Sequence, residues 1–402
     1  MTLTLRQTIL AGCAALFIAG CSDNNDAVAS AGAGLPPGGG GGDSALQKKL
    51  APDAPEGQLA LSVETLADGL VNPWSISFFP DGTILVTERP GRIRAVRNGV
   101  LEAEPIAGAP EVFAEGQAGL FDILPHPNYA QNNVIFLSYA YGSEDANYLR
   151  VARAIFDGEA ISNLEVIYDA KPPKEAGYHF GGRLVWGPDD KLYFTVGEGS
   201  RYKEKAQDMT TSYGAVIRLN EDGSVPDDNP DFGPGSLPEL YSKGHRNPQG
   251  LAYDGARDIL WEHEHAAMGG DEINIIKPGA NYGWPIATYG IDYNGARITP
   301  FTEYEGTEQP FKYWTPSIAP SGLAIYRGDL FGDWDGDLLI GALARTALHR
   351  VIMDGDKEAG EERYLIGERV RDVRVGPDGA IYVTTEDRGG APVGKLLRLT
   401  PQ

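Results

Sequence analysis

Cysteine is almost absent from this chain of 402 residues, with only Cys13 and Cys21, both near the N-terminus. If Cys13 is removed with a leader, Cys21 is the only thiol left, and no intramolecular disulfide can form. A single thiol at this place also argues against a redox site or a cysteine-ligated metal in the folded part. Any stability must therefore come from a packed core.

Positive charge is scarce as well. The chain has 34 Lys and Arg against 56 Asp and Glu, a net charge of −22 and a pI of about 4.6. A chain this acidic is a poor partner for nucleic acids or anionic lipids, because both are polyanions. We therefore predict no nucleic-acid partner, and any group of arginines in one place becomes informative.

Long stretches with helical periodicity are also scarce, whereas glycine (52) and proline (28) are abundant. This composition is typical of an all-β chain with many turns. An apolar run at residues 9–19 follows Arg6, and it is too short to span a bilayer. Residues 1–20 are therefore predicted to be a secretion signal.

The predicted signal ends in Ile18-Ala19-Gly20-Cys21, which resembles a bacterial lipobox. This resemblance implies that Cys21 becomes the lipid-modified first residue. Ser22 after it favours retention at the outer membrane, on the periplasmic side. An ordinary signal peptide cleaved nearby is the alternative. Residues 21–58 are Gly-rich, cannot bury a core and are predicted to be a flexible linker.

A unit of strand, tight turn and strand recurs along residues 59–402, followed each time by another short alternating strand. The turns lie at residues 80–82, 127–128, 188–190, 254–255, 335–336 and 377–379. Their Pro, Asp, Asn and Gly residues favour tight hairpins. Six copies of a multi-stranded unit predict a six-bladed β-propeller. A large β-sandwich is the alternative, but it does not explain the repetition.

Unusual polar residues precede these turns at one phase of the repeat, where the first strand of a blade begins. They are Gln117, His179, Arg246, Arg369 and Arg371. The innermost strands of a propeller line its central channel, so these residues are expected to meet at one mouth. Three arginines there predict a binding site for an anion, and the histidine can take a proton near neutral pH. The alternative is that they only face a water-filled channel.

The densest polar segment is GHRNPQGL, residues 244–251. It places the guanidinium of Arg246 and the amides of Asn247 and Gln249 between two glycines. Such groups bond planar carboxylates with a defined direction. A capped turn with an exposed arginine is the simpler alternative.

These residues resemble the pyrroloquinoline quinone (PQQ)-dependent soluble aldose and glucose dehydrogenases, a family of six-bladed propellers. The likeness spans nearly all of residues 59–402. The matching segments are GQAGL (116–120), His179 with GRL (182–184), GHRNPQGL (244–251), GDEIN (270–274) with NYGWP (281–285), and RVRDV (369–373).

The resemblance implies oxidation of an aldose at C1 to a lactone, with PQQ and Ca²⁺ as cofactors and an external quinone or cytochrome as electron acceptor. The roles that it implies are as follows: His179 as general base with Arg246 as a second catalytic residue; Gln117, Arg246, Asn247, Arg345, Arg369 and Arg371 for PQQ; Gln117 and Glu198 for the sugar; the carbonyls of Ala266 and Ala267 for the catalytic Ca²⁺; and Glu272 and Tyr282 for an accessory Ca²⁺.

Three positions depart from the family pattern. Ala344 replaces a lysine that pairs with a PQQ carboxylate, so either the neighbouring Arg345 compensates or the cofactor is held more loosely. Glu198 stands where the family has Asp. Ala266-Ala267 stands where the family has Gly-Pro.

Other functions are compatible with a propeller, because the fold carries many activities. One is a calcium-dependent lactonase that needs no quinone, and another is a non-catalytic surface protein that binds proteins or glycans. His263 and His265, on one face of a strand, also suggest a zinc site, although no third histidine or cysteine lies at ligand spacing.

Overall fold

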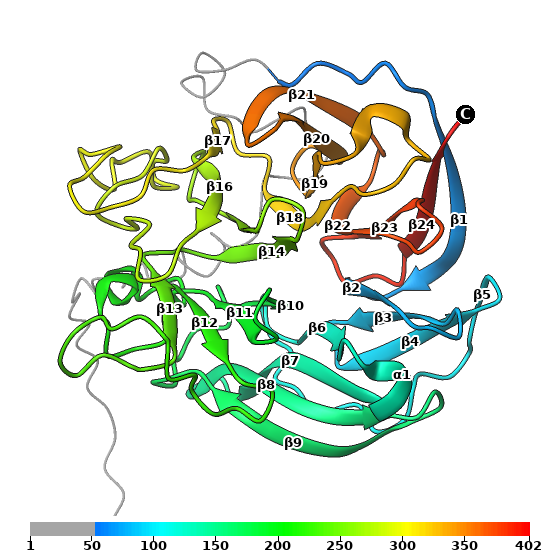
Figure 1. Cartoon of the computed structure of the whole chain (residues 1–402), viewed down its shortest axis with the longest axis horizontal. Coiled ribbons are helices and arrows are strands. Elements are labelled where there is room, and N and C mark those ends of the chain that lie inside the picture. The colour runs from blue at the N-terminus through cyan, green and yellow to red at the C-terminus, as the bar shows by residue number, and fades with distance from the viewer. Residues whose placement is uncertain (1–52) are drawn as a thin grey trace, which may run out of the picture. The chain divides into compact units, whose positions relative to one another are not determined.

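The structure, a computed structural model, describes residues 53–402. Within this range, six four-stranded antiparallel sheets surround a common centre (Figure 1). The predicted all-β, six-bladed propeller is therefore confirmed. The predicted signal, the lipidation at Cys21 and most of the predicted linker lie outside the described residues.

Each sheet is one blade, numbered here from the strand nearest the centre outward. Blade 1 is β2 (Pro73–Phe78), β3 (Ile84–Glu88), β4 (Arg92–Arg97) and β5 (Val100–Leu101). Blade 2 is β6 (Leu120–Pro125), β7 (Val134–Gly142), β8 (Asn147–Phe156) and β9 (Ile161–Asp169). Blade 3 is β10 (Gly181–Trp186), β11 (Leu192–Val196), β12 (Ala215–Leu219) and β13 (Leu240–Lys243).

Blade 4 is β14 (Pro248–Asp254), β15 (Ile259–Glu264), β16 (Asp271–Ile276) and β17 (Lys312–Trp314). Blade 5 is β18 (Pro320–Ile325), β19 (Leu338–Ala342), β20 (Ala347–Asp354) and β21 (Lys357–Leu365). Blade 6 is β22 (Arg369–Val375), β23 (Ile381–Glu386), β24 (Gly394–Pro401) and β1 (Leu61–Leu70). The short helices are α1 (Tyr129–Asn132), η2 (Lys203–Gln207) and η3 (Gly332–Trp334). None of the helices in residues 53–402 has the length and apolarity to cross a membrane.

The last blade is closed by a strand from the other end of the described chain. β1 pairs antiparallel with β24, from Leu61 opposite Pro401 to Leu70 opposite Gly394. Figure 1 shows the two strands side by side, blue against dark red. The repeat pattern did not predict this pairing, because β1 carries no hairpin turn of its own.

A buried polar cluster joins the inner strands near the centre. The side chain of Arg183 on β10 is 1% exposed, with its guanidinium 3.6 Å from the Asp122 carboxylate and 3.1 Å from that of Asp372. The Asp122 carboxylate accepts from the Ser75 hydroxyl (2.5 Å) and from the backbone N–H of Leu184 (2.9 Å). Strands β2, β6, β10 and β22 are thereby linked through two carboxylates and one guanidinium.

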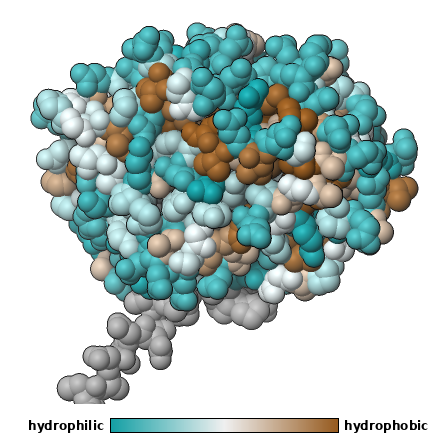
Figure 2. Space-filling view, turned by 90° about the horizontal axis from the view of Figure 1, so that it is seen from below, coloured by the Kyte–Doolittle hydropathy of each residue, from teal (hydrophilic) through white to brown (hydrophobic). Residues whose placement is uncertain are grey.

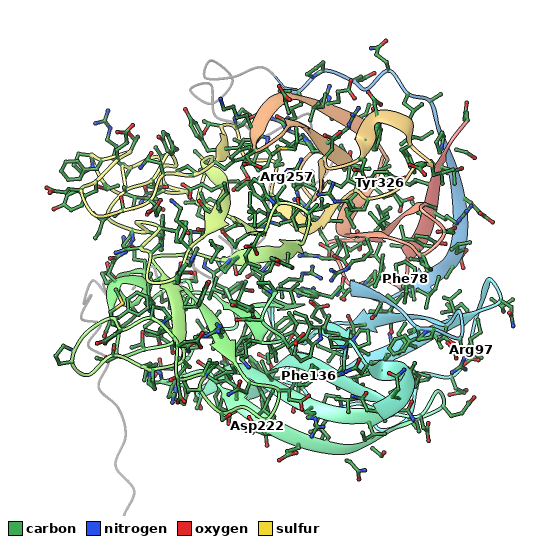
Figure 3. All side chains as sticks on the ribbon, viewed as in Figure 1. Phe78, Arg97, Phe136, Asp222, Arg257 and Tyr326 are labelled. Atoms are coloured by element: carbon green, nitrogen blue, oxygen red, sulfur yellow. The ribbon has the colours of Figure 1, made fainter. Side chains whose placement is uncertain are left out.

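Aromatic side chains pack between neighbouring blades, among them Phe78 on β2 and Phe136 on β7, which Figure 3 labels. Phe78 meets Tyr382 across blades 1 and 6 with ring centroids 4.9 Å apart, and Phe136 meets Trp186 across blades 2 and 3 at 5.2 Å. Such edge-to-face pairs add to the free energy gained by burying the rings. The face of the molecule shown in Figure 2 is mostly hydrophilic and carries hydrophobic patches.

The closure by β1 predicts that Leu70→Ala is strongly destabilising. Leu70 is fully buried, and leucine truncation in a core costs about 2–5 kcal/mol of unfolding free energy. Val63→Ala on the same strand is the matched control, because Val63 is 51% exposed and should change stability by less than about 0.5 kcal/mol. Urea unfolding of both variants measures the difference, and equal losses would contradict a role of β1 in closing the ring.

Candidate active site

His179 and Gln117 meet where blades 2 and 3 begin. The Gln117 side-chain oxygen accepts the backbone N–H of His179 at 3.0 Å. His179 has a left-handed backbone (φ 50°), and a Cβ added to Gly197 would lie 2.3 Å from its carbonyl oxygen. Only glycine therefore permits this close approach, and the approach fixes the backbone that carries the imidazole.

The ring of His179 faces the carboxylate of Glu198, a position that the sequence marked as substrate-binding. His179 Nδ1 lies 3.0 Å from Glu198 Oε1, and both side chains are buried. A carboxylate accepts at this contact, so Nδ1 carries the proton and Nε2 keeps its lone pair. The second carboxylate oxygen, Oε2, is buried with no hydrogen-bond partner among the residues described.

Burial lowers the pKa of His179, because a charged imidazolium loses its hydration. Glu198 raises this pKa, whereas Arg246 and Lys174 lower it further, and the net direction is downward. The imidazole is therefore neutral at pH 7 and can accept a proton, as a general base must.

Arg246 and Asn247 are held by the neighbouring strand β15. The Glu264 carboxylate accepts the backbone N–H groups of both residues, the second at 3.3 Å. The Arg246 guanidinium donates to the carbonyl of His265 (3.0 Å) and to that of Ala266, and it lies 5.3 Å from the centre of a Trp284 ring. GHRNPQGL is thus a buried, braced segment, and the alternative of an exposed turn is wrong.

Arg369 and Arg371 converge on Glu386, at the end of β23. Arg371 donates Nε and Nη2 to the two oxygens of Glu386, each at 2.8 Å, and Arg369 Nη2 donates to one of them at 3.2 Å. Burial alone would raise the pKa of Glu386, but Arg371 and Arg369 lower it to about 2. Reasoning from the sequence missed Glu386, which the structure places opposite Arg369 in the pairing of β22 with β23.

Gln249 connects the two arginine regions. Its side-chain oxygen accepts from Arg371 Nη1 at 3.4 Å, and its amide donates to Asn247 Oδ1 at 3.3 Å. Arg371 of blade 6 and Asn247 of blade 4 therefore belong to one bonded chain. The contacts bring two residues predicted for the cofactor, Arg371 and Asn247, into one group.

The chain matches the glucose/sorbosone dehydrogenase family over residues 70–398. The chain belongs to this family. It is 40% identical over 352 residues to the aldose sugar dehydrogenase YliI of Escherichia coli, with coverage of 85% of this chain and 93% of that protein. It is 29% identical over 413 residues to quinoprotein glucose dehydrogenase B of Acinetobacter calcoaceticus, with coverage of 81% and 85%.

A solved structure in the same family is the PQQ-bound aldose sugar dehydrogenase of Streptomyces coelicolor. It shares 28% identity with a TM-score of 0.70, and the match covers 87% of this chain and all of that one. The predicted family and enzyme class, an oxidoreductase of the sugar dehydrogenases, are confirmed. PQQ as the cofactor associated with these relatives is confirmed as well.

The remaining predicted cofactor residue, Arg345, forms an ion pair with Asp53 at 3.2 Å. Two residues before it, the Leu343 carbonyl accepts Arg369 Nη1 at 3.0 Å. The loop that carries Ala344 therefore touches the arginine group through its backbone.

The predicted calcium positions lie around β15 and β16. Ala266 and Ala267 are buried, and the Ala266 N–H donates to Asp271 Oδ1 at 3.0 Å. Glu272 stands opposite Glu264, and burial together with the charge of Glu264 raises its pKa well above the ordinary value. The Tyr282 hydroxyl donates to the Ile275 carbonyl at 2.6 Å, so its phenol oxygen already takes part in a backbone contact.

The zinc alternative for His263 and His265 does not fit. Nε2 of His263 lies 3.0 Å from the Gly322 carbonyl, and Nε2 of His265 lies 2.6 Å from that of Pro320. Burial lowers the pKa of His263 to about 4 and that of His265 well below its ordinary value. Both rings are neutral donors that join blade 4 to blade 5. A different group, His245 with Glu262 and Glu264, brings its ligand atoms within 4.8 Å of one another, and the sequence did not indicate it.

The pairing of Glu386 predicts a pH-dependent contribution to stability. Its pKa is depressed in the folded state, so the stabilisation is present above the ordinary pKa of about 4.5 and is lost as the pH falls towards 2. Relative to the wild type, Glu386→Gln should lose about 3 kcal/mol at pH 7 and progressively less below pH 4.5.

Denaturant unfolding at several pH values measures this difference. Glu308→Gln is the control, because the ion pair of Glu308 with Lys277 has side chains 39% and 56% exposed. Such a pair contributes at most about 1 kcal/mol. A loss in Glu386→Gln that does not change with pH would contradict the depressed pKa.

Proposed function

We propose that this protein oxidises an aldose at C1 to the lactone, with PQQ as cofactor and His179 as general base. The observation that carries the proposal is the buried His179–Glu198 pair, in which Nδ1 faces the carboxylate and the charge of Arg246 acts on the ring. A neutral base beside a set of guanidinium groups suits proton removal next to a polycarboxylate cofactor.

The donor set fits PQQ, which is planar and carries three carboxylates. Arg246, Arg369 and Arg371 offer positively charged guanidinium groups, although the Nε and Nη2 of Arg371 are already bonded to Glu386, and Asn247 and Gln117 offer amides. The Nε of Arg369 is buried and, within residues 53–402, has no protein acceptor, so it is available to a ligand oxygen. Arg345 is proposed as a further cofactor contact in place of the lysine absent at Ala344. When bound, PQQ supplies the quinone that takes up hydride from the sugar.

Calcium is proposed at two places. The carbonyl oxygens of Ala266 and Ala267 would hold the ion beside the cofactor, because Ca²⁺ accepts backbone carbonyls readily, and the Ala266 carbonyl would then exchange its contact with the Arg246 guanidinium for the ion. Glu272 and Tyr282 would hold an accessory ion. Oxygen-only ligands of this kind suit a hard cation.

The residues of the chain have distinct tasks in the reaction. His179 Nε2 removes the proton of the C1 hydroxyl, and Glu198 stabilises the resulting imidazolium through Nδ1–H. Glu198 Oε2 is available to accept a hydroxyl of the sugar. Arg246 stabilises negative charge that develops at the quinone end of the site.

Electrons would leave to an external quinone or cytochrome. We propose that the protein works in the bacterial periplasm, held by a lipid at Cys21, most consistently at the outer membrane. The lipobox at residues 18–21 supports this localisation.

Reconstitution tests the proposed function. The purified protein with added PQQ and Ca²⁺ should reduce a dye when an aldose is present, and removal of Ca²⁺ with EDTA should abolish the activity. Activity with Ca²⁺ and a lactone but without PQQ would instead identify a lactonase. The absence of both a quinone spectrum and sugar-dependent dye reduction would refute the dehydrogenase.

His179→Ala should retain PQQ binding and lose turnover by about 10²–10⁴-fold, the usual contribution of a general base. PQQ binding is followed by its absorbance and turnover by dye reduction. His126→Ala is the control, since His126 pairs with Glu221 in a contact away from the site. Unchanged turnover in His179→Ala would exclude the mechanism.

A further inference from the structure

Lys174 is a buried lysine in the segment between β9 and β10. Its side chain is almost fully buried, and the whole residue is 3% exposed. The ammonium donates to Asn147 Oδ1 at 3.0 Å and to the Ala176 carbonyl, and it lies 3.4 Å from the centre of the Phe180 ring. The backbones of Lys174 and Asn147 also bond to each other in both directions at 2.8 Å. The ammonium is therefore held at one place.

This place adjoins the His179–Glu198 pair. The stem of Lys174 packs against Gly199, directly after Glu198: a Cβ added to Gly199 would lie 2.8 Å from Lys174 Cδ. The Glu198 carboxylate acts electrostatically on the ammonium, and the ammonium acts on the His179 ring. Lys174 thus carries a positive charge that acts on the same carboxylate whose Oε2 has no protein donor within the described chain.

Burying the Lys174 ammonium away from water costs free energy, because the charge loses its hydration. Burial lowers the pKa of Lys174 to about 7, and the charge of Glu198 offsets part of this effect. A buried charge is seldom the most stable choice for packing alone, because an apolar side chain of similar volume avoids the loss of hydration. The position therefore suggests a use beyond stability.

Lys243 offers a comparison within the same protein. It is also buried, and burial lowers its pKa to about 7. Its ammonium donates to backbone carbonyls, among them that of Thr211 at 3.2 Å, and Asp208 is the carboxylate that acts on it. It does not contribute to the field at His179, where Glu198, Arg246 and Lys174 are the charged groups.

We propose that Lys174 is a positioning residue of the sugar-oxidising site, whose buried positive charge attracts the Glu198 carboxylate and favours the neutral, proton-accepting form of His179. The proposal rests on the proposed function of His179. The loop at residues 143–146 is connected to Lys174 through hydrogen bonds of Asn147. The Asn147 side chain accepts a hydrogen bond from the ammonium and donates one to the Ser143 carbonyl at 3.0 Å. Lys174 therefore joins a surface turn of blade 2 to the proton-transfer pair.

The first test needs no turnover. The full-length protein is labelled at its histidine rings, and the ring of His179 is titrated by NMR, with its signals identified by their loss in His179→Gln. In Lys174→Met, His179 should keep its proton to a higher pH than in the wild type, because the repelling charge is gone. In the matched control Lys243→Met, the His179 ring should titrate at the same pH as in the wild type. The proposal is overturned if the His179 ring titrates at the same pH in Lys174→Met as in the wild type. It is also overturned if Lys243→Met shifts the titration of His179 as much as Lys174→Met does.

The second test uses the reconstituted enzyme. The acid limb of kcat/KM against pH should move to higher pH in Lys174→Met, so the loss of activity relative to the wild type should grow as the pH falls. Lys174→Gln keeps a donor for Asn147 without the charge and serves where Lys174→Met does not fold. A loss of equal size at every pH indicates a merely structural lysine and overturns the proposal. If the wild type shows no sugar-dependent reduction, the proposed function fails, whereas the NMR titration still decides the coupling of Lys174 to His179.

Discussion

The guanidinium of Arg183, buried between Asp122 and Asp372, is the contact on which the centre of the molecule depends. Four of the six inner strands converge on these carboxylates, and a charge of either sign left alone there would be very costly. The ring of strands is therefore tied by directed polar bonds as well as by apolar packing. A rigid ring in turn lets loops of different blades present side chains to one another with little freedom, as His179, Arg246 and Arg371 do.

Much of this could be predicted from the sequence. The turn residues repeat, so the six blades and their inner strands follow from local chemistry that each copy carries by itself. The phase of Gln117, His179, Arg246, Arg369 and Arg371 in the repeat then places them together, because equal positions in equal units meet at one end of a propeller. The roles drawn from family resemblance for Arg345, Glu272 and Tyr282 rest on motif alone, and their contacts in the structure neither require nor exclude them.

Other features could not be predicted from the sequence, for physical reasons. Glu386 and Lys174 are ordinary charged residues in the sequence, and their importance comes from burial beside particular partners. Glu264 braces Arg246 across blade 4 through a side chain aimed at a backbone, which no spacing rule describes. The histidines of the HEH run resembled metal ligands because a strand places them on one face, yet carbonyls of blade 5 already occupy their Nε2 atoms. The pairing of β1 with β24 joins segments far apart along the chain, and local patterns are silent about such contacts.

That pairing has a consequence for the order in which the protein becomes active. Gln402 bonds to Leu61 across a separation of 341 residues, so the ring closes only after the strands of blade 6 have been made. Arg369, Arg371 and Glu386 belong to that last blade, while His179 and Arg246 belong to blades made earlier. The part of the proposed site that carries His179 is thus synthesised before the part that carries Arg369 and Arg371. Under the proposed function, full cofactor binding has to wait until the ring is closed.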